Sequence, residues 1–218
     1  MIENKLRCVN SDFLMVILTE NNWLYAGLRA LMPEMVCLPL RFSADRLPYI
    51  IGDVDRVLVV VDSRIIFRGE WSALNALKAK RPDATVVWLA LKETGRVFPV
   101  ESQGVRVLAQ KLDIASLHFA LRRTLYNPDS IRGEEYVEGT NLTLTERCLL
   151  PYFVSGLQMH VVSRLTGKPV KTLYTHRQNI LEKTGFRLPV FLQFVHERNQ
   201  GLPGIPELEH IDVSAPVI

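Results

Sequence analysis

Short apolar runs alternate with segments of helical periodicity along the first 125 residues of the chain. The apolar runs have strand length and cover residues 13–18, 35–40, 56–62, 84–91 and 105–109. Continuous runs rich in Val, Leu and Ile are typical of strands buried on both faces. Segments with apolar residues at helical spacing occur at residues 23–31, 71–80 and 114–125. Strands that alternate with helices predict a parallel sheet covered on both faces, which favours a flavodoxin-like, doubly wound α/β domain.

The pattern changes after residue 125. Residues 126–140 contain turn formers and charges with little periodicity, which is typical of a linker. Residues 141–199 carry only helical patterns, and residues 200–218 contain three Pro and indicate a flexible acidic tail. We therefore expect an α/β domain at residues 1–125, a linker at 126–140, an all-α domain at 141–199 and a tail at 200–218.

Four helices are predicted in the all-α domain, at about residues 143–156, 158–165, 170–184 and 188–198. Thr143 or Thr145 can cap the first helix, and Glu146 follows Thr143 at the spacing of a capping box. The third helix is expected to bury one apolar stripe, formed by Val170, Leu173, Ile180 and Leu181.

The second and third helices are joined by a turn that contains Gly167 and Pro169, and Gly185 ends the third helix. Two helices joined by a tight turn with Gly, the second of them basic, predict a helix-turn-helix motif. In such a motif the N-terminal residues of the second helix reach base edges in the major groove of DNA.

The distribution of charge agrees with this division. The 218 residues have a formal net charge of +3. Residues 141–199 hold 8 Lys+Arg against 3 Asp+Glu, whereas residues 200–218 hold 3 acidic residues and no Lys or Arg. Such a local basic excess is typical of a surface that neutralises phosphates. A randomly basic small domain would show the same excess, so the pattern of motifs has to decide.

Composition and motifs exclude several other classes of protein. The apolar runs stop well short of the roughly 18 residues of a membrane span. The first residues lack the long apolar core of a signal peptide, so we expect a cytoplasmic protein with no membrane partner. Cys8, Cys37 and Cys148 lack the spacing of a disulfide framework or a zinc site and are expected to be reduced core thiols.

An enzyme is not expected either. The sequence has no nucleophile elbow, no dinucleotide-binding glycine fingerprint and no P-loop. Its five His residues show no ligand spacing. We therefore predict no catalytic residue, no metal and no cofactor.

A set of residues in the all-α domain is similar to a known family. The set comprises Leu142, Thr143, Glu146, Leu149, Leu150, Gly156, Val162, Lys171 to His176, Ile180, Lys183 and Gly185. These residues resemble the DNA-binding domain of the LuxR/FixJ/NarL-type bacterial transcription regulators, with every interval preserved. The chain departs from the family pattern at Thr145, at Met159 to Val161, at Thr166 and at Thr184.

The resemblance implies a role for residues of the third helix. Tyr174, Thr175 and Gln178 stand at the family's base-contacting positions, where they can exchange hydrogen bonds with bases or touch a thymine methyl group. The other candidates for DNA contact, most of them basic and suited to phosphates, are Lys168, Lys171, Thr172, Arg177 and Lys183. Tyr174 could also be a plain surface aromatic, and Lys183 a helix-end lysine favoured by the dipole. We expect His176 to pack rather than to catalyse.

The fourth helix presents an apolar face formed by Leu188, Phe191, Leu192 and Val195. Part of this face must cover the helix-turn-helix core. The remainder could pair with a second subunit, as the resemblance implies, or the whole face could belong to the core.

The first domain resembles, more distantly, the receiver of a response regulator. Thr19 and Glu20 stand where that family has a pair of acids, and Asp62 stands where it has the phosphoacceptor. Aspartyl phosphorylation needs a magnesium ion held by the acids, a hydroxyl after the fourth strand and a lysine after the fifth. One acid is missing here, and Ala90 replaces the hydroxyl residue.

The remaining receiver positions are less well defined. The next hydroxyl after the fourth strand belongs to Thr94, and Gln110 or Lys111 fills the lysine position. We therefore expect a pseudo-receiver without ordinary aspartyl-phosphate control, in which neighbouring backbone N–H groups bind Asp62.

The combined layout resembles that of auxiliary regulators of the RcsA/BglJ type. The resemblance implies that the chain pairs with itself or with another response-regulator-type protein. The predicted function is sequence-specific regulation of transcription by binding double-stranded DNA. The alternative is an interaction protein that sequesters a partner regulator without binding DNA.

Overall fold

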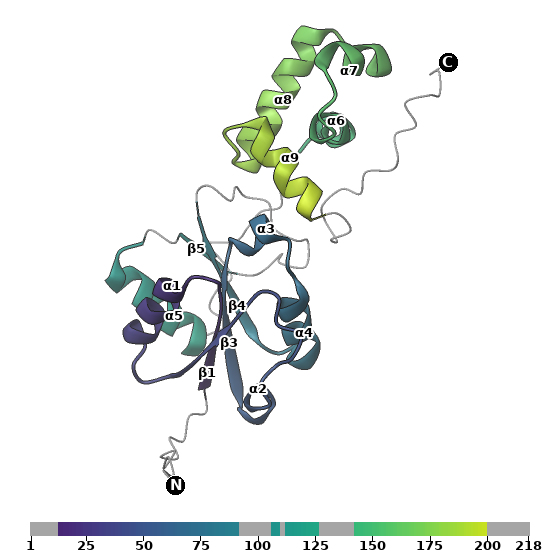
Figure 1. Cartoon of the computed structure of the whole chain (residues 1–218). Helices are drawn as coiled ribbons and strands as arrows, with labels where there is room; N and C mark the ends of the chain where they lie inside the picture. The colour runs from purple at the N-terminus through teal and green to yellow at the C-terminus, as the bar shows by residue number, and fades with distance from the viewer. Residues whose placement is uncertain (1–12, 92–105, 110–111, 127–141, 200–218) are drawn as a thin grey trace. The chain divides into compact units, whose positions relative to one another are not determined.

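The computed structural model describes residues 13–91, 106–109, 112–126 and 142–199 (Figure 1). The chain divides into two compact units. The first contains residues 13–65, 70–90, 106–109 and 112–126 of the described part, and the helical segment 142–199 belongs to the second. The predicted tail and nearly all of the predicted linker lie outside the described residues, as does Cys8.

A five-stranded parallel sheet forms the centre of the first unit. Its strands are β1 (Phe13–Leu18), β2 (Val36–Leu40), β3 (Arg56–Asp62), β4 (Thr85–Ala90) and β5 (Arg106–Ala109). They lie in the order β2-β1-β3-β4-β5, with Val16 of β1 opposite Val59 of β3. This is the strand order of the flavodoxin-like, doubly wound fold, so the predicted fold class is confirmed.

Helices cover both faces of this sheet. On one face, α1 (Asn22–Leu31) and α5 (Ile114–Tyr126) pack over a core that includes Met15, Leu58 and Leu121. Figure 1 shows α2 (Ile50–Asp53) and α4 (Ser72–Lys80) on the opposite side. Leu14 to Leu18 of β1 and Val57 to Val61 of β3 are buried because apolar residues point to both faces, which explains their continuous apolar runs.

Two short helices were not predicted from the sequence. These are α2 and α3 (Ile65–Arg68), each of four residues. Four residues are too few to show helical periodicity. The last helix of the unit, α5, includes Tyr126 and so continues one residue into the predicted linker.

The second unit contains four helices within residues 142–199. They are α6 (Leu144–Val154), α7 (Met159–Thr166), α8 (Val170–Thr184) and α9 (Pro189–Arg198). Their apolar faces enclose a core whose buried residues include Leu149, Phe153, Val162, Leu173, Ile180, Leu181, Leu192 and Val195. The predicted all-α helix-turn-helix unit is therefore confirmed.

Two predictions about burial were wrong. Val170 is 38% exposed, because it is the first residue of α8 and follows an exposed turn. On α9, Leu192 and Val195 are buried and cover the core, as expected for part of the predicted apolar face, whereas Leu188 and Phe191 are largely exposed. Cys148 is exposed on α6 and is not a core thiol, whereas Cys37 is half-buried.

Thr166 and Thr184 stand at apolar positions of the family pattern, and each hydroxyl finds a hydrogen-bond acceptor in its own helix. The Thr166 hydroxyl donates to the carbonyl of Val162 at 2.7 Å, and the Thr184 hydroxyl donates to the carbonyl of Ile180 at 2.7 Å. Each threonine thus bonds the preceding turn of its own helix. Neither hydroxyl is left unsatisfied, so these departures are compatible with a packed core.

Candidate functional site

The turn between α7 and α8 is held by its own backbone geometry. Gly167 ends α7 with a φ of +67°, in the left-handed region that favours glycine. The Ser163 hydroxyl donates to the Lys168 carbonyl at 2.7 Å, and Pro169 stands immediately before α8. Proline in this place suits a helix start, because its missing N–H would have no partner there. The turn therefore sets the direction of α8 from α7.

A buried carboxylate connects α8 to α6. Thr143 and Glu146 form a reciprocal capping box, in which the backbone N–H of Thr143 donates to Glu146 Oε2 at 2.8 Å. The ammonium of Lys183, in the last turn of α8, lies 2.7 Å from the same oxygen. The alternative cap, Thr145, is not used. One buried glutamate thus caps α6 and anchors the far end of α8.

The pKa of Glu146 reflects this arrangement. Burial acts to raise the pKa, but hydrogen bonds from Lys183 and Thr143, together with the positive charge of Lys183, outweigh it. The resulting pKa of Glu146 lies below its usual value. The ionised carboxylate is therefore favoured in the folded unit.

One face of α8 carries the three residues expected to contact bases. Lys171, Tyr174, Thr175 and Gln178 are all exposed and follow one another at helical spacing of three, one and three residues. Residues with this spacing share one side of a helix. Thr172 is also exposed and lies at the edge of these residues, three positions before Thr175. The structure therefore brings all three predicted base-contacting residues and one predicted phosphate contact together; we call these four residues the α8 stripe.

Neighbours on α8 hold two side chains of the stripe. The Arg177 guanidinium lies 4.8 Å from the centre of the Tyr174 ring. Gln178 donates its Nε2–H to Glu182 at 3.0 Å. The first contact is a cation–π pair and the second a hydrogen bond one turn along the helix. Glu182 was not among the residues considered in the sequence, because only its contact with Gln178 draws attention to it.

Three other predicted residues lie apart from the stripe. Lys168 is half-buried in the turn. Lys183 is paired with Glu146, which argues against the phosphate contact expected for it and favours the structural alternative. His176 is half-buried, and its Nδ1 atom has no hydrogen-bond partner among the described residues.

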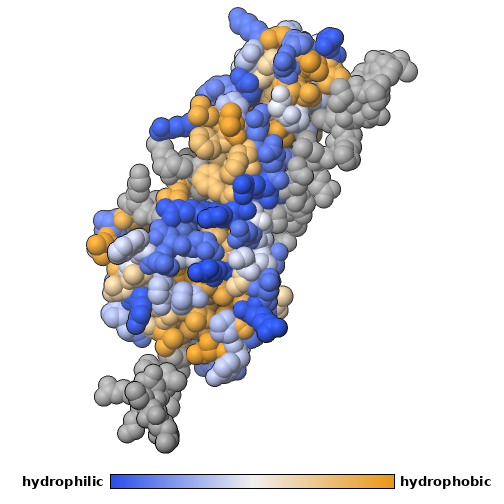
Figure 2. All heavy atoms as spheres, viewed as in Figure 1, coloured by the Kyte–Doolittle hydropathy of each residue, from blue (hydrophilic) through white to orange (hydrophobic). Residues whose placement is uncertain are grey.

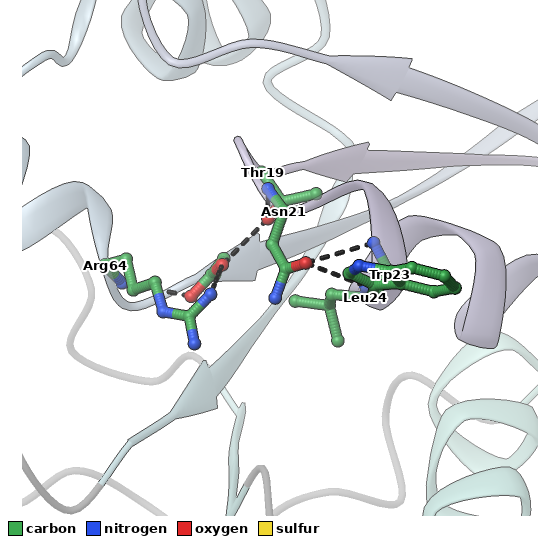
Figure 3. Close-up of polar contacts among 6 residues, drawn as sticks. Thr19, Asn21, Trp23, Leu24 and Arg64 are labelled. Carbon is green, nitrogen blue, oxygen red and sulfur yellow. Dashed lines mark hydrogen bonds and ion pairs between the residues drawn. The ribbon is translucent and has the colours of Figure 1, made fainter.

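The second candidate site surrounds Asp62, at the carboxyl end of β3. The Asp62 side chain is buried, and Thr19, directly after β1, donates its hydroxyl to Asp62 Oδ2 at 2.7 Å. The backbone N–H of Arg64 donates to Oδ1 at 3.1 Å, and the Arg64 guanidinium lies 3.9 Å from Oδ2 (Figure 3). The expected backbone partner of Asp62 is confirmed, and the Thr19 hydroxyl is a partner that was not predicted.

The two residues that follow Thr19 are also engaged. Glu20 accepts a hydrogen bond from the backbone N–H of Phe42 at 3.1 Å. Asn21 caps α1 by accepting from the N–H groups of Trp23 and Leu24 (Figure 3). Within the described part of the chain, no three His, Cys, Asp or Glu residues come together as metal ligands. The carboxylates of Asp62 and Glu20 at this end of the sheet therefore accept hydrogen bonds from other protein groups.

The other receiver positions are only partly described. Ala90 is half-buried at the end of β4 and has no hydroxyl to offer. Thr94, Gln110 and Lys111 lie outside the described residues.

Solved structures with the same two-unit architecture include RcsB. The chain matches the RcsB–DNA complex with a TM-score of 0.56 and 14% sequence identity, over 85% of this chain and 98% of that chain. The chain has the fold of RcsB. It also matches a structure of two RcsB dimers bound to two parallel DNAs, with a TM-score of 0.56 and 12% identity, over 85% and 98% of the two chains.

A third match is RcsB from Salmonella enterica serovar Typhimurium, bound to a promoter in the presence of a phosphomimetic. Its TM-score is 0.54 at 11% identity, over 86% of this chain and 99% of that RcsB chain. No protein-family model and no curated protein sequence matches the chain. The likeness to RcsB is therefore one of fold. Among the described helices, none has the length and apolar character needed to cross a membrane.

Proposed function

We propose that this chain is a regulator of transcription that binds double-stranded DNA through α8. The observation that carries the proposal is the α8 stripe, which is exposed on the second helix of a well-packed helix-turn-helix. The two-unit fold shared with RcsB, which has been solved bound to DNA, supports the same conclusion. On this proposal the protein acts in the cytoplasm and is not an enzyme.

The residues of α8 divide into two roles. Tyr174, Thr175 and Gln178 would contact bases, because their side chains are exposed and offer donors, acceptors and a methyl group. Lys171 and Arg177 would contact phosphates, with Lys168 and Thr172 at the edge of the interface. Lys183 holds α8 against α6 and contributes to binding only through that contact.

Control by ordinary aspartyl phosphorylation is not part of the proposal. Asp62 is buried, and its two oxygens accept from Thr19 and Arg64. The paired acid needed for magnesium is a threonine. Incubation with a small phosphoryl donor should therefore give no magnesium-dependent, acid-labile label; a label that appears on the wild type and disappears in Asp62→Ala would contradict this.

The DNA-binding proposal is tested by titrating binding against salt. Each phosphate contact contributes a slope of about −0.9 in log K against log salt concentration. Lys171→Ala should weaken binding to all sequences and reduce the slope by about 1. Lys80→Ala, which removes an exposed lysine from the first unit, is the matched control and should leave both unchanged.

Base reading is tested separately on sequences selected from a random pool. Tyr174→Ala and Gln178→Ala should each relax the preference at one or two positions, at a cost of about 1–3 kcal/mol per lost contact. Specific binding that survives Lys171→Ala and Tyr174→Ala together would overturn the assignment of α8.

The sequestering alternative gives a different result in the same experiments. A protein that only captures a partner regulator would show no salt-dependent DNA binding. The unusual Met159 and Thr166, which suggested this alternative, do not disturb the turn: Met159 is buried, and Thr166 bonds its own helix. The structure of the motif therefore favours DNA binding.

A further inference from the structure

Glu182 is the only acidic residue of α8, the helix proposed to contact DNA. Its side chain is exposed, and within the described part of the chain it forms no ion pair. Figure 2 shows hydrophilic residues at the surface where α8 lies, in the same view as Figure 1. A carboxylate near DNA phosphates is repelled by them and weakens binding to every sequence. Phosphate contact therefore does not explain Glu182, and its hydrogen bond with Gln178 is the contact that needs interpretation.

Gln178 and Glu182 lie one turn apart on the same side of α8. Gln178 stands about 12 Å along the helix axis from Val170, the first residue of the helix, and Glu182 about 18 Å. In a helix-turn-helix the N-terminal residues of the second helix reach the base edges. Gln178 is therefore the nearer of the two to the bases, and Glu182 stands behind it.

The contact fixes the orientation of the Gln178 amide. A glutamine amide carries donors on its nitrogen and an acceptor oxygen, and a free side chain can turn the amide over to present either. Here Nε2 donates to Glu182 Oε1 at 3.0 Å, and a carboxylate can only accept. The nitrogen is thus held on the Glu182 side. Because Oε1 lies on the other side of the amide carbon, one of the two orientations is selected.

A fixed amide suits one base better than the others. Adenine presents an acceptor, N7, beside a donor, the N6 amino group, and a glutamine amide can match both at once. Guanine presents two acceptors, N7 and O6. Toward guanine the amide oxygen of Gln178 would face a second acceptor, and one of the two N–H groups is already donated to Glu182. The held amide therefore matches adenine and mismatches guanine.

We propose that Glu182 positions the amide of Gln178 so that Gln178 reads an adenine in the major groove and rejects guanine. The inference rests on the proposed function, because it names the base that one residue of the α8 stripe selects. Glu182 is a positioning residue that acts through Gln178 without touching DNA. Its charge lowers affinity for all sequences alike, whereas its hydrogen bond raises discrimination at a single base pair.

The test uses the full-length chain and DNA sites selected from a random pool. The base pair read by Gln178 is the one whose preference is relaxed in Gln178→Ala. All four base pairs are then compared at that place by equilibrium competition. The wild type should bind the adenine site more tightly than the guanine site by about tenfold or more, the discrimination typical of a good bidentate contact.

Two variants of Glu182 separate its hydrogen bond from its charge. Glu182→Ala should reduce the adenine-to-guanine ratio at least about twofold, because the freed amide can turn over and donate to guanine. Glu182→Gln keeps an acceptor without the charge and should retain most of the ratio. Both variants should bind all sequences more tightly, because a repelled charge is removed. Glu197→Ala, which removes an exposed glutamate from α9, is the matched control and should leave the ratio unchanged.

A double variant shows whether Glu182 acts through Gln178. In a Gln178→Ala background, Glu182→Ala should change no base preference, because the residue it positions is absent. A cytosine preference at another place, lost with Glu182 in both backgrounds, would mean that Glu182 accepts directly from cytosine and would overturn the inference. A wild type that prefers a base other than adenine would also overturn it, as would a ratio that Glu182→Ala leaves unchanged.

Folding does not confound these variants, and DNA binding separates the inference from the proposed function. Glu182 is exposed, and alanine and glutamine both favour helices, so thermal midpoints should match that of the wild type. Salt-dependent DNA binding that responds to Lys171→Ala, with base preferences indifferent to Gln178 and Glu182, would refute the inference alone. A wild type that binds no DNA would refute the proposed function and the inference together.

Discussion

Two buried carboxylates, one in each unit, differ in what their hydrogen bonds hold together. Glu146 accepts from the N–H of Thr143 and from the ammonium of Lys183, and so fixes the helix that carries the candidate DNA-contacting residues. Asp62 accepts from a hydroxyl and a backbone N–H and lies 3.9 Å from an exposed guanidinium. Both are satisfied by protein groups. The comparison teaches that protein groups can satisfy a buried carboxylate either between two helices, as for Glu146, or at the end of a strand, as for Asp62.

The largest expected effect comes from removing Glu146. Glu146→Ala deletes half of the capping box and the partner of Lys183, and we expect it to destabilise the helical unit by about 2–3 kcal/mol. Denaturant unfolding, with hydrogen exchange of the α6 and α8 amides, would measure the loss. Glu197→Ala removes an exposed glutamate from α9 and should cost less than about 0.5 kcal/mol. Similar small costs for both variants would contradict the anchoring role.

A second prediction concerns a substitution that adds a carboxylate beside Asp62, as a metal site would need. Thr19→Asp places a third carboxylate beside Glu20 and Asp62, and repulsion should destabilise the first unit by about 1–3 kcal/mol without divalent cations. Magnesium should restore the lost stability in the variant, because a cation bound only by the folded state stabilises it. Thermal melts with and without magnesium test this, with Thr19→Val as the control that removes the hydroxyl but adds no charge. A variant indifferent to magnesium would show that more than Thr19 blocks the site.

The pKa of Glu146 predicts a smaller, pH-dependent effect. Because this pKa is lower in the folded unit than the usual value of about 4.3, the stabilisation is fully present above that value and is lost as the pH falls through the folded pKa. Stability of the helical unit should therefore fall between about pH 4.3 and more acidic values. Glu146→Gln should flatten this acid limb. An unchanged limb in the variant would assign the acid sensitivity to other carboxylates.

The smallest expected effect concerns the α8 stripe itself. Arg177→Ala removes an exposed cation–π contact with Tyr174 and should change stability by less than about 1 kcal/mol. DNA affinity should nevertheless fall, because Arg177 is proposed to contact phosphate. A loss of stability comparable to that of Glu146→Ala would mean that the pair belongs to the core rather than to the interface.

The fold was largely predictable because its strands and long helices carry strong patterns. The five apolar runs correspond to β1 to β5 within about one residue at each end, and the helical segments correspond to α1 and α4 to α9. Among the helices of the described residues, α2 and α3 alone were not predicted, since a single turn leaves no period to detect. Val170 was wrongly assigned to the buried stripe of α8. The apolar periodicity continues to the first residue of the helix, but no neighbouring element covers the side chain there.

The candidate sites were predicted as positions but not as contacts. Sequence spacing places Tyr174, Thr175 and Gln178 on one face of a helix, and the structure exposes them there. It does not show that Lys183 reaches back 37 residues to Glu146, or that Thr19 donates across 43 residues to Asp62. Such contacts depend on how distant elements pack. The same holds for the exposed apolar side chains Trp23, Ile114 and Phe119, whose exposure the sequence pattern does not show.

The order of the strands also has a consequence for folding during synthesis. The earliest of the described strands along the chain, β1, lies inside the sheet, between β2 and β3, and its five residues from Leu14 to Leu18 are buried. A nascent chain or fragment that ends before Arg56 would lack β3 and would leave this apolar strand with an open edge. Open apolar edges recruit strands from other molecules. Truncations of the first unit within this region should therefore aggregate, and folding during synthesis has to wait until β3 is available.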